Sequence, residues 1–195
     1  MKLRTLSLLA LFIVSVAQAA DYDVDASHSN VDFKIRHMMS KVNGNFGKFT
    51  GTFSFDAKKP EAAKGVFTVE AASINTNNEK RDGHLKGDDF FNVGKFPTLT
   101  FNTTGFKKAG KGFAMSGDLT MLGVTKPVTF NVEYLGAGKD PWGNSKAGFS
   151  ATGKINRKDF GMVWNKALDA GGVLLGEEVE ITLNIEAAEK AAAAK

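Results

Sequence analysis

Apolar side chains recur at every second position through most of residues 30–186. This period of two is typical of β-strands that turn one face toward a core and the other toward water. Eight segments show the pattern, with Thr, Ser, Asn, Lys and Asp at the intervening positions. Their inward rows begin at Val31, Phe49, Phe67, Leu99, Phe113, Val128, Ala147 and Val179. The sequence therefore predicts an all-β domain.

The links between the segments are mostly short and contain glycine or polar residues, as at 108–112 and 136–144. Links of this kind favour antiparallel neighbours over crossover helices. Eight such strands predict an up-and-down, lipocalin-like barrel, whose interior is just wide enough to be filled by side chains or to hold one small ligand. A two-sheet sandwich stays open as an alternative, because alternation alone does not show that the sheet closes.

The alternation stops between residues 73 and 92, in the connection between strands three and four. Thr76 and Glu79 have the T-x-x-E spacing of a capping box, and Gly87 is placed to end a helix. We expect a short helical segment here that forms a lid over one mouth of the barrel. Long connections in barrels can also simply plug an end.

The first residues have the pattern of a secretory leader. Lys2 and Arg4 precede an apolar run over 6–16, and Ala17, Gln18 and Ala19 give a small-x-small cleavage site. The run is well short of the ~20 residues that a membrane-spanning helix needs. We expect a signal peptide at 1–19, a barrel domain at 20–187, a flexible tail at 188–195, and a periplasmic location.

Composition narrows the classes of partner. The chain has no cysteine and so no disulfide framework. Its formal net charge is +4, to which Lys2 and Arg4 of the leader contribute. Because no dense basic cluster occurs, we expect neither nucleic acid as a partner nor a membrane span. Phenylalanine is the outlier, with 16 residues against 2 Tyr and 2 Trp, and it predicts a purely apolar interior.

Histidines and one arginine are the candidate polar contacts. His28, His37 and His84 could together bind a metal, but their spacing matches no metal motif, and we expect none. His37 ends an apolar row and could meet a ligand head group at the rim, or bind nearby backbone. On the expected helix, Arg81, His84 and Leu85 share one face. That face suits an anionic or carbonyl head group, with an ion pair of Arg81 to a carboxylate as the alternative.

Several motifs in order resemble those of the YceI-like proteins, which are periplasmic polyisoprenoid-binding barrels. The resemblance covers nearly all of the chain after the leader. It rests on D-x-x-H-S at 25–29, V-D-F-K-I-R-H at 31–37, V-N-G-N-F-G-K-F-T-G at 42–51, N-E-K-R-D-G-H-L at 78–85, D-F-F at 89–91, K-F-P-T-L-T-F at 95–101, G-D-L-T-M-L-G-V-T-K-P-V at 117–128, D-P-W-G at 140–143 and I-N-R-K-D-F-G at 155–161.

The resemblance implies a carrier without catalysis or cofactor, which holds a long isoprenoid-type lipid, polyprenyl or quinone-like, in an apolar tunnel. The candidate ligand-binding residues are Phe33, Ile35, His37, Phe53, Phe67, Arg81, His84, Phe101, Met115, Leu119, Phe130, Phe149 and Ile181. A homodimer stays open. Two alternatives remain: an enzyme acting on such a lipid, with His84 or His37 as acid/base and Asp82 orienting it, and a ligand-free structural or stress protein whose barrel is packed solid.

Overall fold

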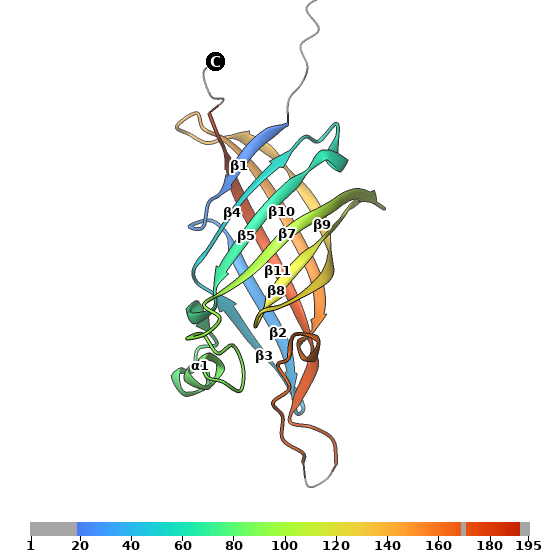
Figure 1. The fold of residues 1–195 in the computed structure, drawn as a ribbon. Coiled ribbons are helices and arrows are strands. Elements are labelled where there is room, and N and C mark those ends of the chain that lie inside the picture. The colour runs from blue at the N-terminus through green and yellow to red at the C-terminus, as the bar shows by residue number, and fades with distance from the viewer. Residues whose placement is uncertain (1–18, 169–170, 192–195) are drawn as a thin grey trace, which may run out of the picture.

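The computed structural model describes residues 19–168 and 171–191, and most of them lie in one antiparallel sheet (Figure 1). The strands are β1 Ala20–Val24, β2 Asn30–His37, β3 Ser40–Phe46, β4 Phe49–Phe55, β5 Lys64–Glu70, β6 Ile74–Asn75, β7 Thr98–Ala109, β8 Gly112–Met121, β9 Val124–Lys139, β10 Ser145–Asn156 and β11 Leu175–Glu189. One α-helix, α1 Glu79–Lys86, and three 3-10 turns, η1 Pro60–Ala62, η2 Ala71–Ser73 and η3 Arg157–Phe160, complete the described elements.

The sheet closes on itself. Eight strands form a ring in the order β1-β4-β5-β7-β8-β9-β10-β11, and β11 returns to pair with β1. All pairings in the ring are antiparallel between neighbours. The predicted eight-stranded up-and-down barrel is confirmed, and the sandwich alternative is wrong, because a sandwich would leave strand edges where β1 meets β11.

The three remaining strands, β2, β3 and β6, do not add staves to the eight-stranded barrel. They extend it along its axis. β1 and β2 both pair with β11, at Val24↔Ala187 and Asn30↔Asn184, so they form one long strand that is interrupted at residues 25–29. β3 and β4 likewise pair with β2 and β1, and β6 pairs with β3. These extensions carry the barrel toward the end at which α1 lies, called here the lower end (Figure 1). The upper end is where β1 begins and β11 ends.

Helix α1 lies in the connection between the third and fourth long strands, as predicted, and it ends at Gly87. Its N-cap is Asn78, whose side chain accepts a hydrogen bond from the Arg81 backbone N–H at 3.0 Å. The capping box assigned to Thr76 is therefore wrong. Thr76 instead lies before the helix and binds Asp82, whose Oδ1 accepts from the Thr76 backbone N–H at 2.9 Å.

The sheet opens locally at the lower end between β9 and β10. Pairing of these strands reaches only Thr152↔Asn131, although β9 begins at Val124. The turn η3 follows β10 directly and contacts both β9 and β11, so it occupies this opening. Its Phe160 is 2 % exposed.

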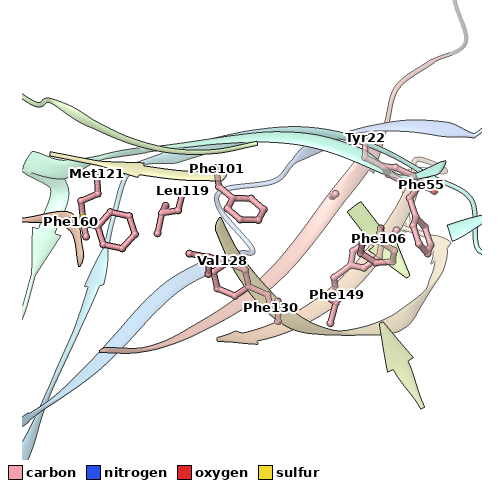
Figure 2. Packing of buried hydrophobic residues seen from close by; sticks show 14 of the residues in the cluster. Tyr22, Phe55, Phe101, Phe106, Leu119, Met121, Val128, Phe130, Phe149 and Phe160 are labelled. Carbon is pink, nitrogen blue, oxygen red and sulfur yellow. The ribbon is translucent and has the colours of Figure 1, made fainter. Parts of the chain in front are cut away.

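Buried apolar side chains form one cluster that extends along the barrel (Figure 2). Tyr22, Phe55, Phe106 and Phe149 lie together at the upper end, and Leu119, Met121 and Phe160 lie toward the other. Phe101, Val128 and Phe130 lie between them. The barrel wall is thus apolar from one end to the other.

Two terminal predictions meet the structure only in part. The predicted leader lies outside the described residues except for Ala19. At the other end, β11 continues through Ala188 and Glu189, which were expected in the flexible tail, and Lys190 N–H donates to Asp21 O at 2.7 Å. Among the described residues, none of the helices is both long and apolar enough to cross a membrane.

Candidate functional site

A cavity of about 680 Å³ runs inside the barrel. This volume is within the range of ~300–1,000 Å³ that is usual for small-molecule sites. Its wall is made mainly of the inward rows of the strands, and 12 of the 16 phenylalanines line it. The phenylalanines therefore line the interior without filling it, contrary to the solidly packed barrel that was one alternative.

The structure brings all the predicted ligand-binding residues to this one cavity. Phe33, Ile35, His37, Phe53, Phe67, Arg81, His84, Phe101, Met115, Leu119, Phe130, Phe149 and Ile181 all line it. The location of those on strands follows from the period of two, because every second residue of a barrel strand faces the interior, whereas Arg81 and His84 reach the cavity from α1. Contact of these residues with a ligand stays a prediction.

Glycines on neighbouring strands explain how large rings leave a cavity. The Phe101 ring lies over Gly117, where a Cβ atom would come within 3.0 Å of ring carbons. The same arrangement occurs in the pairs Phe33 with Gly44, Phe67 with Gly51, and Phe130 with Gly153. Because a glycine has no side chain, each ring can lie against the wall instead of projecting to the barrel axis. These four contacts are called here the phenylalanine–glycine pairs.

The upper end of the cavity is closed by aromatic rings. Phe55 lies at its centre, with ring centroids 5.1 Å from both Tyr134 and Phe149. Phe106 and Phe113 pack beside it with centroids 5.0 Å apart. Tilted and edge-to-face contacts at these distances are favourable beyond the area that they bury. This group, the upper aromatic cluster, makes the upper end mainly apolar, with Ser54 and Lys64 as polar residues in its lining.

The lower end carries the histidines and arginines of the site. His84 of α1 packs edge-on against both Phe90 and Trp164, with ring centroids 5.0 Å from each, and these two rings also contact each other. Its Nε2 is 2.8 Å from Asp89 Oδ2. Trp164 also lines the cavity, and the strand pattern could not predict it because it lies in the connection after η3.

Arg81 lines the cavity beside His84, as the shared helix face predicted. Its guanidinium is already engaged, because Nε donates to Thr76 Oγ1 and Nη2 donates to Thr76 O, both at 2.7 Å. The partner is thus a threonine rather than the carboxylate that was the alternative. Arg81 fastens α1 to the segment before it.

The arrangement proposed for an enzyme is not assembled among the described residues. Asp82 was expected to orient a histidine, but its Oδ1 accepts from Thr76, and the carboxylate at His84 is Asp89. General acid/base catalysis needs a donor and an acceptor positioned toward a substrate. His37, the other candidate acid/base, lines the cavity from the end of β2. Its carbonyl oxygen accepts a hydrogen bond from Ser40 Oγ at 3.3 Å.

Arg157, which sequence analysis missed, is the most buried cation of the site. It lines the cavity and is 1 % exposed. Nε donates to Gly176 O at 2.9 Å and Nη1 to Met162 O at 2.6 Å. Nη2 is buried and has no hydrogen-bond partner in the described part of the chain. Burial lowers the pKa of Arg157, and the charge of Glu177 opposes this shift.

A signal for Arg157 was present in the sequence. The inward row of β10 runs through Ala147, Phe149, Ala151, Gly153 and Ile155, and the next position of the same period is Arg157. A charged residue that continues an apolar inward row is unusual, because burying an uncompensated charge is costly.

The histidines do not gather into a metal site in the described residues. The one group of three potential ligands there is Asp25, His28 and Glu186, whose ligand atoms lie within 4.8 Å of one another. Lys146 Nζ is 2.7 Å from Asp25 Oδ2 and 3.3 Å from Glu186 Oε1, so a cation of the protein already lies among these oxygens. The hydrogen bond from Lys146 is the largest of the effects that lower the pKa of Asp25, and Asp25 in turn raises the pKa of His28. The cluster holds residues 25–29, which separate β1 from β2, against β10 and β11.

Comparison with known proteins identifies relatives over almost the whole barrel. Residues 22–187 match the YceI-like domain. The chain is 44% identical over 179 residues to Protein YceI of Salmonella arizonae, covering 90% of this chain and 91% of that protein. The crystal structure of the Campylobacter jejuni YCEI protein superimposes with a TM-score of 0.70 at 35% identity, covering 86% of this chain and 96% of that one.

A more distant likeness concerns the fold alone. A polyisoprenoid binding domain from Saccharophagus degradans, implicated in plant cell wall breakdown, superimposes with a TM-score of 0.62 at 14% identity. The match covers 89% of this chain and 100% of that domain. The barrel architecture is therefore shared by proteins whose sequences have diverged widely.

Proposed function

The chain belongs to the YceI-like family, and on that premise we propose that it binds and carries a long-chain isoprenoid-type lipid, polyprenyl or quinone-like, inside its barrel. The observation that carries the proposal is the unfilled cavity of about 680 Å³ with its phenylalanine wall. The Saccharophagus degradans domain of the same fold, which bears the name of a polyisoprenoid binding domain, supports the choice of ligand class.

The lining suits an apolar chain better than a compact polar metabolite. Each methylene that moves from water into such a wall contributes about 0.8 kcal/mol. A prenyl chain of a few units therefore binds with a net gain after the cost of ordering it. The wall discriminates little between chains of similar length, since one methylene changes the binding free energy by only about 0.8 kcal/mol. Selection falls to the polar lower end.

The proposal includes a periplasmic location and no cofactor or catalysis. The location rests on the leader pattern at 1–19, and a carrier of this kind needs no reacting group. In support, the names of the family and of the relatives reported above are not those of enzymes. An enzyme would require a positioned acid and base, whereas the side chains of His84 and Asp82 have separate partners.

Native mass spectrometry of the mature protein purified from its own periplasm tests the proposal. The bound molecule is then released by denaturation, extracted into organic solvent and identified. We expect a stoichiometric prenyl or quinone-like lipid. The carrier function would be contradicted if repeated preparations contain no lipid and the protein also fails to bind added farnesol and ubiquinone. That result would favour a ligand-free structural role.

A further inference from the structure

The lower end of the barrel carries exposed apolar side chains at its outermost turns. The turn between β2 and β3 and the connection from η3 to β11 both lie at this end (Figure 1). Four exposed residues there, Met38, Met39, Val163 and Val173, are called here the apolar tip. We propose that the apolar tip docks the barrel on the surface of a lipid bilayer. Docking goes beyond the proposed function, and exchange of ligand with that bilayer rests on it.

The large apolar side chains that are exposed gather at this end. Seven occur in the described part of the chain, and four of them form the apolar tip. The other three, Val66, Leu135 and Trp142, lie apart on β5, on β9 and in the turn after β9. One exposed apolar side chain is ordinary, whereas several at one end of a protein mark a surface that contacts a membrane or a partner.

The turn between β2 and β3 has an unusual composition. β2 ends at His37 and β3 begins at Ser40, so Met38 and Met39 are its two central residues. Turns of this length favour asparagine, aspartate and glycine, which tolerate a positive φ. Met38 has a φ of 49° all the same, and Met39 is 99 % exposed. An apolar side chain that is held at a conformational cost, away from the core, indicates a function at this position.

Backbone contacts join the segments that carry the apolar tip. Met38 N–H donates to Leu174 O at 2.9 Å, and Leu174 N–H donates to Lys166 O at 2.9 Å. Ala167 pairs with Val173 in an antiparallel bridge. The turn and the two arms of the connection are thus held side by side, so their apolar side chains can enter a bilayer surface together.

The apolar tip adjoins the cavity. His37 and Leu174 line the cavity, and they are the sequence neighbours of Met38 and Val173. Trp164, which directly follows another residue of the tip, lines it as well. An apolar chain that passes between a bilayer and the cavity at this end therefore exposes little surface to water on its way. This continuity favours a bilayer over a protein as the occupant.

Two cations flank the apolar tip. Arg36 and Lys166 are exposed, and neither has an ion-pair partner among the described residues. Lys41 pairs with a glutamate of β11, and Asp169, the one acid within the connection, lies outside the described residues. Apolar side chains with arginine and lysine around them are typical of segments that bind at a membrane surface. The cations are therefore assigned to lipid phosphates, which predicts a preference for anionic lipid.

Co-sedimentation of the mature protein with vesicles tests the proposal. Vesicles of phosphatidylcholine and phosphatidylglycerol in equal parts should bind the wild type. Met39→Gln should lower the partition coefficient about tenfold, because the burial of one methionine side chain is lost. Trp142→Gln is the matched control, since Trp142 is 84 % exposed in a turn at the upper end, and it should leave the coefficient unchanged.

The cations are tested on the same vesicles. Lys166→Gln should lower the partition coefficient about fivefold, the contribution of one lysine at an anionic surface. It should leave binding to vesicles of phosphatidylcholine alone unchanged. Lys111→Gln, in the exposed turn between β7 and β8 at the upper end, is the control. An unchanged coefficient for Lys166→Gln overturns the assignment of the cations to lipid phosphates.

A fluorescent label gives a direct readout of insertion. The chain has no cysteine, so Met39→Cys and Trp142→Cys each introduce a single site for an NBD group. The label at position 39 should brighten and shift to the blue when vesicles are added, because NBD responds in this way to an apolar environment. The label at position 142 should not respond.

Docking by the apolar tip is overturned if the wild type binds neither kind of vesicle, if Met39→Gln sediments as the wild type does, or if both labels respond alike. It is also overturned if the wild type is a dimer that Met39→Gln dissociates, because a second copy then covers the tip. Farnesol binding without vesicles reports on the carrier function separately, and Met39→Gln should keep it. Loss of farnesol binding in the wild type overturns the carrier function, and the vesicles still decide on docking.

Discussion

The two ends of the barrel are built by different means. The upper end is packed with rings that belong to well-separated strands, so Phe55 of β4 contacts Phe106 of β7 and Phe149 of β10. The lower end also has contacts between distant residues, such as His84 with Trp164, but α1 and the segment before it are held by hydrogen bonds between residues close in sequence, as in Asn78 with Arg81. Packing between distant strands resists opening, whereas local contacts break without unfolding the whole domain. We therefore expect a ligand to enter at the lower end and its polar group to be recognised there.

Phe55→Ala should give the largest effect, because it breaks the upper aromatic cluster. Phe55 is 5 % exposed, and removal of a buried ring costs about 3–5 kcal/mol of unfolding free energy. Urea denaturation measures this change, with Leu135→Ala as a control, since Leu135 is 61 % exposed. A loss as small as that of the control would show that the upper end does not hold the barrel together.

Gly153→Ala acts between the two ends, on a phenylalanine–glycine pair. The added methyl would lie within 3.0 Å of the Phe130 ring, which supplies all three of its nearest contacts, and should force that ring into the cavity. We expect a loss of about 1–3 kcal/mol of unfolding free energy and weaker farnesol binding. Gly138→Ala is the matched control, because a Cβ there meets nothing within 4 Å. Unchanged affinity in both variants would reject the role of the pairs in keeping the cavity open.

Asn78→Ala should affect the lower end alone. Loss of the N-cap destabilises α1 by about 1 kcal/mol, which corresponds to roughly fivefold faster amide hydrogen exchange in residues 79–86. Exchange in the upper strands should stay as in the wild type. Equal acceleration in both regions would mean that the ends unfold together, against the comparison drawn above. Lys80→Ala, at an exposed position of the same helix outside the cap, serves as the control.

The smallest effect is expected where the barrel's long first strand is interrupted. The pKa of Asp25 is lowered in the folded protein, so its ion pair with Lys146 stabilises the fold above the ordinary pKa of 3.8 and stops doing so as the pH falls. Asp25→Asn should therefore lower the unfolding free energy at pH 7 by about 1 kcal/mol or less, and by progressively less below pH 4. A difference that is independent of pH would contradict this origin.

The alternation predicted the barrel well because burial has the same period in every strand. It missed β1 and β3 for a physical reason. Inward residues of the first long strand change from Val24 to Val31, and those of the second from Phe46 to Phe49, so the period shifts phase at each interruption. A phase shift makes one long strand resemble two unrelated segments.

The site was predicted less completely than the fold. Side chains on the inward rows reach the cavity as soon as the barrel closes, whatever the loops do. Phe101 and Ile181 therefore line it, as expected. Trp164 and the true N-cap Asn78 depend on how irregular segments fold, and no period describes them. The partners of His84 and Arg81 likewise follow from tertiary contacts that residue types alone do not fix.

Each phenylalanine–glycine pair sets the width of the cavity at its own height along the barrel axis. Phe33 with Gly44 and Phe101 with Gly117 lie on separate strands, so each level can vary without the other. A bulkier residue in place of glycine is tolerated where the facing ring is the only group in its way and shrinks with it, for example in Gly153→Ala with Phe130→Leu. Such paired substitutions would change the width of the cavity at one height at a time, and so the thickness of the ligand that fits, without changing the hydrogen bonds between the strands.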